Sequence, residues 1–348
     1  MLRLALLVLA GLLTLAKPSQ AQDVKAVVLR VDYPALLPVS RLDLRPDDLG
    51  FAGAQLATED NQTTGQFMGQ TYVTDVVAAA PETALTEFER LQDAGLRFFA
   101  VQARAEELLA ISEAAAPDTL IFNTLAPDTA LRSAECRGNI LHIAPSRQMQ
   151  SDAVAQFLIW KKWPRWALIH GSHPEDVALA EAYRASAAKF GAKIVDEREF
   201  TDTGGARRTD TGHVQVQRQL PVLTQDLKEH DVIIAADETD VFATYLPFHT
   251  WRPSPIVGSA GLRPLEWHPA LEAWGGTQFQ NRFEELTGRY MRPEDYTAWL
   301  ALRVLGEAVT RTKSADPAEP ARRWADHAER VAARGVPAST LALGYAWA

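Results

Sequence analysis

The sequence is poor in the residues and motifs from which cofactor and metal sites are usually built. A single cysteine, Cys136, excludes an intramolecular disulfide and any cysteine-rich metal site. The glycine-rich signatures for dinucleotides (G-x-G-x-x-G) and nucleoside triphosphates (G-x-x-x-x-G-K-[ST]) are missing. So are the H-E-x-x-H, C-x-x-C and G-x-S-x-G signatures. We therefore expect no cofactor, no metal and no catalytic residue, and predict that the chain is not an enzyme.

Positive charge is also scarce. The 35 Lys and Arg residues stand against 44 Asp and Glu, which gives a formal net charge of −9. Because this charge repels duplex nucleic acid and no basic stripe overrides it, no nucleic-acid partner is expected. Apolar residues make up 47% and charged residues 23% of the 348 positions, a composition that excludes a disordered chain. This length suits two domains or one large α/β unit.

The first residues have the pattern of an export signal. Arg3 supplies a positive charge, residues 4–16 form a short apolar run, and Ser19-Gln20-Ala21 offers small residues for cleavage before Gln22. We predict a signal peptide over 1–21 and a periplasmic mature chain; the alternative is an uncleaved membrane anchor. No second segment approaches the ~20 apolar residues of a transmembrane helix.

The rest of the chain alternates strands with helices in two blocks. Strands separated by helices of ten to fifteen residues favour right-handed crossovers and parallel sheets. The first block is expected to have strands at 24–31, 71–78, 97–102, 119–123 and 139–144, with helices at 48–61, 82–94 and 105–116. The second is expected to have strands at 165–170, 193–200, 231–236 and 255–258, and helices at 149–163 and 174–190. An exposed loop is expected at 202–213 and further helices at 267–276, 280–288 and 293–311.

Several single residues invite an interpretation. Trp160 and Trp163 are spaced i, i+3 on an expected helix, which predicts that both are core residues. Trp251 and Trp267 flank the loop 258–263, where they either wall a cleft or pack between lobes. Cys136 has no assignable base beside it, so a structural cysteine is favoured over a catalytic one.

Two polar groups follow directly on expected strands. Asp237-Glu238 comes after the strand 231–236, and ligands of open α/β sheets bind at the carboxyl ends of strands. His173 lies in the loop after 165–170, close to His170 and to two acids, Glu175 and Asp176. These residues suit either a metal site or a solvated or ligand-contacting loop, and the loop is favoured.

These features together resemble a family, the type I periplasmic substrate-binding proteins of ABC transporters, in the class that binds leucine, isoleucine and valine. The stretch LGFAGAQLATEDNQTTGQFMGQTYVTDVV resembles the early part of that class. Three further stretches resemble a subfamily associated with PQQ-dependent alcohol dehydrogenase systems: CRGNILHIAPSRQMQSDAVAQFLIWKKWPRWALIHG, AADETDVFATYLPFHTWRPSPIVGSAGL and WGGTQFQNRF…DYTAWLALRVLGEA. The resemblance covers about residues 24 to 312.

The resemblance implies an α/β fold of two lobes, each a parallel sheet flanked by helices, joined by hinge crossovers. The implied division is lobe 1 at 22–145, lobe 2 at 146–257, a return to lobe 1 at 258–312 and a divergent segment at 313–348. The implied partners are a small-molecule ligand bound by hinge closure and an ABC permease of the inner membrane. Loops after strands would contact the ligand through Tyr33, Arg104, Asn123, Thr124, His173, Asp237, Glu238 and Gly261.

The sequence departs from the amino-acid binders of that class at two loops. The loop after the third strand reads VQARAEE, and the first loop reads VDYPALLPVSRLDLRP in place of a glycine-rich turn. Both departures count against a branched-chain amino acid as the ligand. Arg41, Arg45 and Arg104 suit an anionic compound, whereas Asp237 and Glu238 suit a cation or hydroxyl groups.

Two functions therefore stay open. One is the solute-binding component of an ABC importer, linked to PQQ-dependent alcohol oxidation, whose ligand is a substrate, product, cofactor or metal of that process. The other is a non-transporting periplasmic accessory or sensor protein of the alcohol dehydrogenase system, with the dehydrogenase as its partner. An enzyme with an unrecognised site is a weaker third alternative. The segment 313–348 is either a native hinge return to lobe 2 or the product of a frameshifted or truncated gene.

Overall fold

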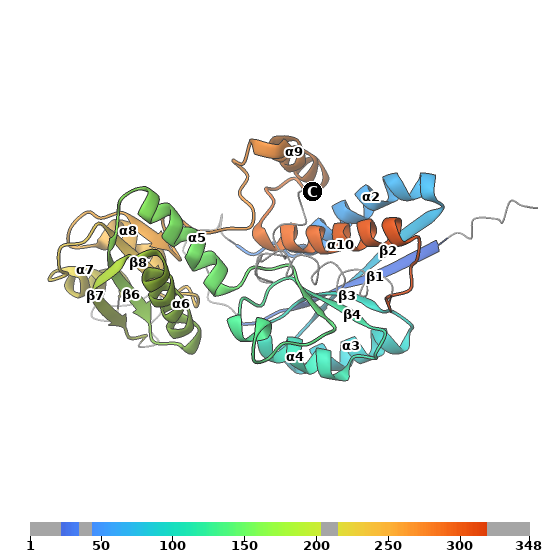
Figure 1. Ribbon diagram of the computed structural model, residues 1–348, viewed down its shortest axis with the longest axis horizontal. Helices are drawn as coiled ribbons and strands as arrows, with labels where there is room; N and C mark the ends of the chain where they lie inside the picture. Colours follow the sequence, from blue (N-terminus) through green and yellow to red (C-terminus); the bar gives the residue numbers. More distant parts are fainter. Residues whose placement is uncertain (1–21, 35–43, 203–214, 319–348) are drawn as a thin grey trace, which may run out of the picture.

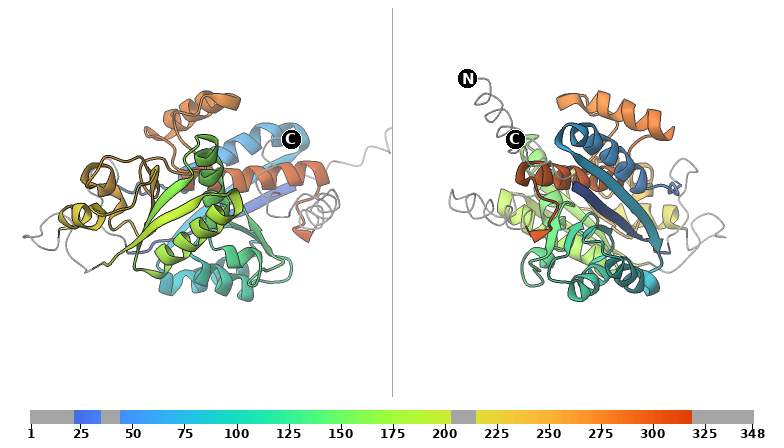
Figure 2. Two further views of the ribbon diagram at one scale, coloured as in Figure 1. Left: turned by 60° about the vertical axis from the view of Figure 1, so that its left-hand side comes forward. Right: turned by 90° about the vertical axis from the view of Figure 1, so that its right-hand side faces the viewer.

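The computed structural model describes residues 22–34, 44–202 and 215–318. Within these ranges the chain has two parallel sheets, each with helices on both faces, arranged as two lobes (Figures 1 and 2). The predicted two-lobed α/β fold is confirmed. The predicted signal peptide, nearly all of the loop at 202–213 and most of the segment 313–348 lie outside the described residues. No helix in the described part is both long and apolar enough to span a bilayer.

The first lobe is built on a five-stranded sheet in the order β2-β1-β3-β4-β5. The strands are β1 (Gln22–Val31), β2 (Gln70–Ala79), β3 (Phe98–Gln102), β4 (Leu120–Asn123) and β5 (Ile140–His142), and every pairing is parallel. All residues of β3 and β4 are buried. Because helices cover both faces, the central strands are near-continuous apolar runs and do not alternate.

Helices far apart in the sequence cover this sheet. On one face, α2 (Phe51–Met68) lies beside α10 (Pro293–Thr312), and on the other lie α3 (Ala84–Asp93) and α4 (Ala105–Ala114) (Figure 1). Gly53 makes the α2–α10 contact possible, since a Cβ there would lie 1.9 Å from the carbonyl oxygen of Asp295. The last described helix thus belongs to the core of the first lobe.

The second lobe repeats the arrangement with four parallel strands in the order β7-β6-β8-β9. The strands are β6 (Arg165–Gly171), β7 (Lys193–Phe200), β8 (Val232–Ala236) and β9 (Ile256–Gly258). Helices α5 (Arg147–Trp160) and α6 (Pro174–Phe190) pack on one face. The shorter α7 (Val216–Thr224) and α8 (Leu246–His249) pack on the other, and neither was expected from the sequence.

Within the described ranges, two crossover segments connect the lobes. The chain leaves the first lobe between β5 and α5, and it returns after β9 towards α9 (Gly276–Thr287). Trp267 of the return segment is buried, and its ring stacks on that of Tyr296 with 5.4 Å between centroids. It also meets the ring of Phe279 edge to face. These aromatic contacts fix the returning crossover to the first lobe.

Two sequence-based expectations are wrong. The helix expected at 267–276 is irregular chain with one 3-10 turn, Ala273–Gly275, in which Trp274 adopts a positive φ of 51°. Trp160 is 71% exposed, since α5 ends there and Lys162, at φ 61°, turns the chain before Trp163. Cys136 is exposed, and its role as a structural cysteine stays a prediction.

Candidate functional site

Tyr33 and Arg104 lie at neighbouring strand ends in the first lobe, after β1 and β3. The Arg104 backbone N–H donates to the Tyr33 hydroxyl at 2.8 Å. The Arg104 guanidinium lies 4.4 Å from the centroid of the Tyr33 ring. That hydroxyl donates in turn to Oε2 of Glu107 at 2.6 Å. Burial, and then the hydrogen bond to Glu107, raise the pKa of Tyr33, so the phenol stays neutral. The sequence did not single out Glu107.

His173 occupies the matching place in the second lobe, in the loop between β6 and α6. Its Nε2 lies 2.9 Å from Oδ2 of Asp202. The hydrogen bond to Asp202 raises the pKa of His173 above 6.5, and the charges of Asp176, Asp202 and Glu175 act in the same direction. The acids around this loop therefore stabilise the protonated form of His173 relative to that of a free imidazole.

One ion pair joins these two groups across the lobes. Nη1 of Arg104 lies 4.0 Å from Oε1 of Glu175, the second residue of α6. Both side chains are more than a third exposed, so the pair is accessible to solvent and weak by itself. We define the inter-lobe cluster as Tyr33, Arg104, Glu107, His173, Glu175 and Asp202. It contains three of the predicted site residues: Tyr33, Arg104 and His173.

Three of the predicted ligand-binding residues form side-chain hydrogen bonds to nearby backbone groups: Asn123, Thr124 and Asp237. Asn123 Oδ1 accepts from the backbone N–H groups of two following residues, and Thr124 Oγ1 donates to a carbonyl of β3. The Asp237 carboxylate accepts from the backbone N–H groups of Val241, Phe242 and Ala243 at 2.8, 2.6 and 2.5 Å. A ligand-binding role for these three residues stays a prediction.

Glu238 lies instead in an ion-pair network centred on Arg147. Its carboxylate oxygens accept from Nε and Nη2 of Arg147 at 2.5 and 2.7 Å, and Nη1 donates to Asp128 of the first lobe at 2.6 Å. Burial alone would lower the pKa of Arg147, but its hydrogen bonds to Glu238 and Asp128 outweigh burial and raise it. Arg147, 6% exposed, is therefore a permanent charge between the lobes.

Sequence reasoning missed Arg147, although one signal was present. It is the first residue of α5, directly after the N-cap Ser146. A cation at a helix N-terminus is disfavoured by the helix dipole, so an arginine there requires acidic partners nearby. That pattern indicates a paired residue without naming the acids.

The last predicted residues have conformational or local roles. Gly261 has a φ of +67°, and a Cβ there would lie 2.2 Å from the carbonyl oxygen of Ile256. Arg45 pairs with Asp32 at 2.9 Å, and Arg41 lies outside the described residues. Within residues 22–34, 44–202 and 215–318, no group of three His, Cys, Asp or Glu side chains is arranged to hold a metal ion.

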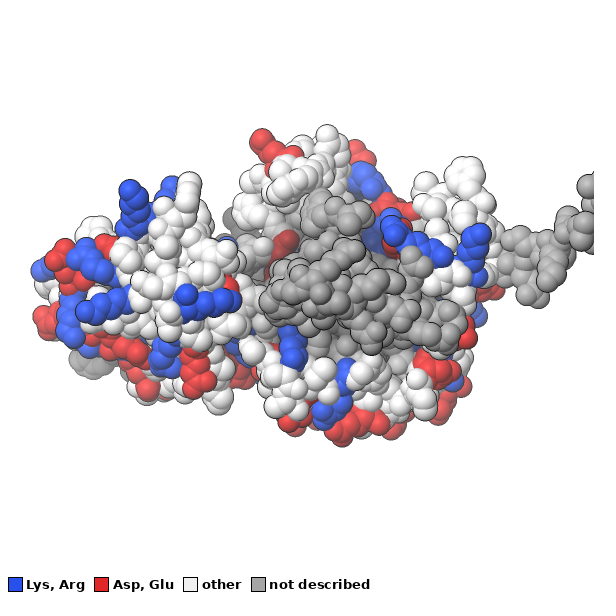
Figure 3. All heavy atoms as spheres, in the orientation of Figure 1, with Lys and Arg blue, Asp and Glu red and all other residues white. Residues whose placement is uncertain are grey.

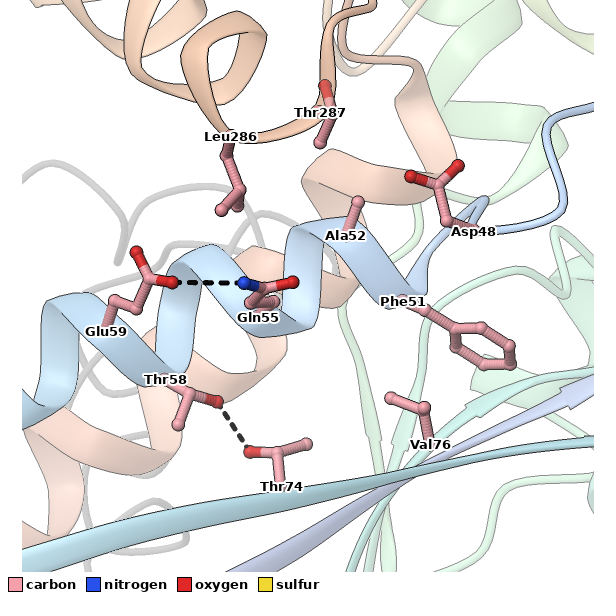
Figure 4. A pocket seen from close by; sticks show the side chains of 10 residues that line it. All are labelled: Asp48, Phe51, Ala52, Gln55, Thr58, Glu59, Thr74, Val76, Leu286 and Thr287. Carbon is pink, nitrogen blue, oxygen red and sulfur yellow. Dashed lines mark hydrogen bonds between the residues drawn. The ribbon is translucent and has the colours of Figure 1, made fainter.

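The surface carries charges of both signs, and the first lobe has a groove outside the inter-lobe cluster. Acidic and basic side chains are interspersed over the face of both lobes that Figure 3 shows. A groove of about 480 Å³ lies between α2, β2 and α9, away from the inter-lobe cluster. Figure 4 shows Gln55 donating to Glu59 along one wall of it, and the hydroxyl pair Thr58 and Thr74 at its floor.

Comparison with known proteins supports the fold. A family model described as "Periplasmic binding protein" matches residues 49–210. A branched-chain amino acid ABC transporter periplasmic ligand-binding protein from Burkholderia xenovorans has a similar structure (TM-score 0.63, 18% identity, 86% of this chain and 81% of that one). A leucine-, isoleucine-, valine-, threonine- and alanine-binding protein from Brucella ovis, in a closed conformation, also has a similar structure (TM-score 0.65, 14% identity, 86% of this chain and 82% of that one).

A third similar structure is an ABC transporter substrate-binding protein from Desulfitobacterium hafniense in complex with Leu (TM-score 0.63, 16% identity, 86% of this chain and 88% of that one). No curated protein sequence matches the chain. At these identities the structures show that the fold is shared.

Proposed function

We propose that this chain is the solute-binding component of an ABC importer, which holds a small molecule between its lobes. The observation that carries the proposal is the inter-lobe cluster, in which Arg104 and Glu175 bring polar strand ends of both lobes within 4.0 Å. The shared fold and the family match over 49–210 support it. A solute that contacts both halves of the cluster stabilises the closed arrangement, because the open one offers it only half of the contacts.

The cluster favours a polar solute with groups of both charge signs or with hydroxyls. Arg104 offers a guanidinium that is 60% exposed, and Glu175 a carboxylate that is 36% exposed. Glu107 adds a second carboxylate, and His173 adds an imidazole whose pKa is raised by its hydrogen bond to Asp202. Arg147 is already paired with Glu238 and Asp128, so its guanidinium adds no free cation for a solute.

The cellular setting belongs to the same proposal. After removal of residues 1–21 the chain would act in the periplasm and deliver its solute to a permease of the inner membrane. The lobes would divide at 145/146 and 257/258, with 313–348 following the return to lobe 1. From the subfamily resemblance we propose that the solute belongs to PQQ-dependent alcohol oxidation and that the dehydrogenase is a functional neighbour.

Thermal denaturation with added compounds tests this function. The panel holds amino acids, alcohols, organic acids, PQQ and metal salts, each at increasing concentration. A bound solute at a hundred times its Kd adds about 2.7 kcal/mol to stability and raises the melting temperature. Arg104→Ala and Glu175→Gln should each reduce the response to that solute.

The matched control is the pair Arg184 and Glu197, which has the same residue types but lies wholly within the second lobe. Arg184→Ala and Glu197→Gln should leave the solute response unchanged. A panel in which no compound raises the melting temperature contradicts the proposal, as does a response that Arg104→Ala leaves intact.

A further inference from the structure

A cavity of about 500 Å³ lies where the chain passes between the lobes. One wall comes from the first crossover and the start of α5, including Pro145 and Met149, and another from the returning crossover, including Leu265 and Trp267. Tyr296 and Leu300 of α10 close it on the side of the first lobe. This volume falls within the range of small-molecule sites, about 300–1,000 Å³.

The wall of this cavity is apolar and partly rigid. Met149, Leu265 and Leu271 contribute aliphatic surface. The Trp267 ring is held by its stack on Tyr296 and by the edge-to-face contact with Phe279, and its Nε1 donates to Gln280 at 3.1 Å. A wall fixed in this way does not need to be ordered by a ligand, which lowers the cost of binding.

One carboxylate lies in this apolar wall. Glu266 is partly buried, and its Oε1 accepts from Nε2 of Gln150, on α5, at 2.8 Å. Within the described residues, no Lys or Arg side chain lies within ion-pair distance of it. Burial raises the pKa of Glu266, the Glu294 charge acts in the same direction, and Arg263 opposes them. A partly buried acid with no ion-pair partner among the described residues is stabilised by a ligand that brings a cation.

We propose that this cavity is a second binding site, for an organic amine whose apolar body packs on Trp267 and whose ammonium pairs with Glu266. Since both crossovers line the cavity, an occupant contacts the two segments that must rotate if the lobes close. The amine would therefore change the affinity of the inter-lobe cluster for its solute, a consequence that rests on the proposed function. Binding to the cavity itself does not depend on it.

Tryptophan signals provide a local test. The protein is labelled with 5-fluorotryptophan, its ¹⁹F signals are assigned by single Trp→Phe variants, and 2-phenylethylamine is titrated in. Trp274 lines the cavity and is 78% exposed, whereas Trp160 is 71% exposed at the far end of α5. The amine should shift the Trp274 signal and leave that of Trp160 unchanged. Neutral 2-phenylethanol should bind at least about tenfold more weakly, and phenylacetate should not bind.

Three variants separate the cavity from non-specific binding. Glu266→Gln should weaken the amine at least about tenfold. Ala153→Trp, at an exposed position on the cavity rim, should block it while the fold is kept. The control is Glu59→Gln: this acid also accepts from a glutamine side chain and lines a groove of similar volume, but no crossover residue lines that groove.

The inference is overturned if the amine and the alcohol bind equally, if Glu266→Gln binds the amine like wild type, or if Trp274 does not respond. The melting response to the inter-lobe solute is measured on the same variants. Loss of amine binding with an intact solute response counts against the cavity alone. Amine binding without any solute response counts against the importer function alone.

Discussion

The carboxylate of Glu238 accepts two hydrogen bonds from the guanidinium of Arg147, at 2.5 and 2.7 Å. Arg147 is the first residue of α5, directly after the first crossover, and Glu238 follows β8 in the second lobe. The same guanidinium donates to Asp128 in the first lobe at 2.6 Å. One buried arginine thus ties a loop of each lobe to the segment about which closure would occur.

Replacing this arginine should destabilise the protein markedly. Arg147→Met leaves Glu238 and Asp128 without their cation, and breaking a buried pair from one side costs about 3 kcal/mol. Urea denaturation of the variant measures the loss. Arg184→Met removes the arginine of a pair that is more than a third exposed, so it should cost less than about 1 kcal/mol. Equal losses of unfolding free energy in the two variants would contradict the claim that burial makes the ion pairs of Arg147 costly to break.

Asp237 should be required for the turn that follows β8. Asp237→Asn replaces one carboxylate oxygen by an NH₂ group that faces backbone donors, which should lower the free energy of unfolding by about 2 kcal/mol. Asp240→Asn is the control: it has the same chemistry at an exposed position with a φ of 58°, which asparagine tolerates. Chemical denaturation compares the two, and a loss of similar size in Asp240→Asn would refute the assigned role of Asp237.

Gly261 is expected to be intolerant of any side chain. Gly261→Ala combines a positive φ with a contact of 2.2 Å to the carbonyl oxygen of Ile256. Gly191→Ala has a similar φ of +76° but nothing within 4 Å of its Cβ, so it measures the backbone strain alone, about 1 kcal/mol. Thermal denaturation should show Gly261→Ala to be the less stable variant by about 1–2 kcal/mol. Similar melting temperatures would show that the loop moves aside at little cost.

His173 gives the structure a defined pH dependence. Its folded-state pKa is raised above 6.5 by the hydrogen bond to Asp202. The pair therefore adds its full stability below about pH 6.5, and this contribution is lost as the pH rises through the raised pKa. NMR titration of the His173 ring should show the raised value, and Asp202→Asn should lower it. A pKa that Asp202→Asn leaves unchanged would contradict this pairing.

The sequence predicts the sheets well because their inner strands, such as β3, β4 and β8, are buried on both sides. Runs such as 232–236 are apolar throughout, and strands of this kind are recognised without any knowledge of their partners. Helix α7 was missed because Pro221 lies within it and the preceding loop is polar. The helix expected at 267–276 failed because Trp267 is held by aromatic rings of α9 and α10, which are distant from it in the sequence.

The candidate site was predictable only in outline. The rule that ligands bind at strand ends located Tyr33, Arg104 and His173, which do lie in one cluster. It does not tell which polar side chains are already used by their own loops, as those of Asn123 and Asp237 are. The pairing of Glu238 with Arg147 joins residues 91 positions apart, so no local pattern names the partner of Arg147.

Small-angle X-ray scattering on the free and the solute-saturated protein tests the central claim most directly. If a solute binds to Arg104 and Glu175 together, the saturated protein should have a smaller radius of gyration than the free protein, and Arg104→Ala should abolish the decrease. A bound solute that leaves the scattering profile unchanged, in wild type and variant alike, would contradict binding by closure of the two lobes.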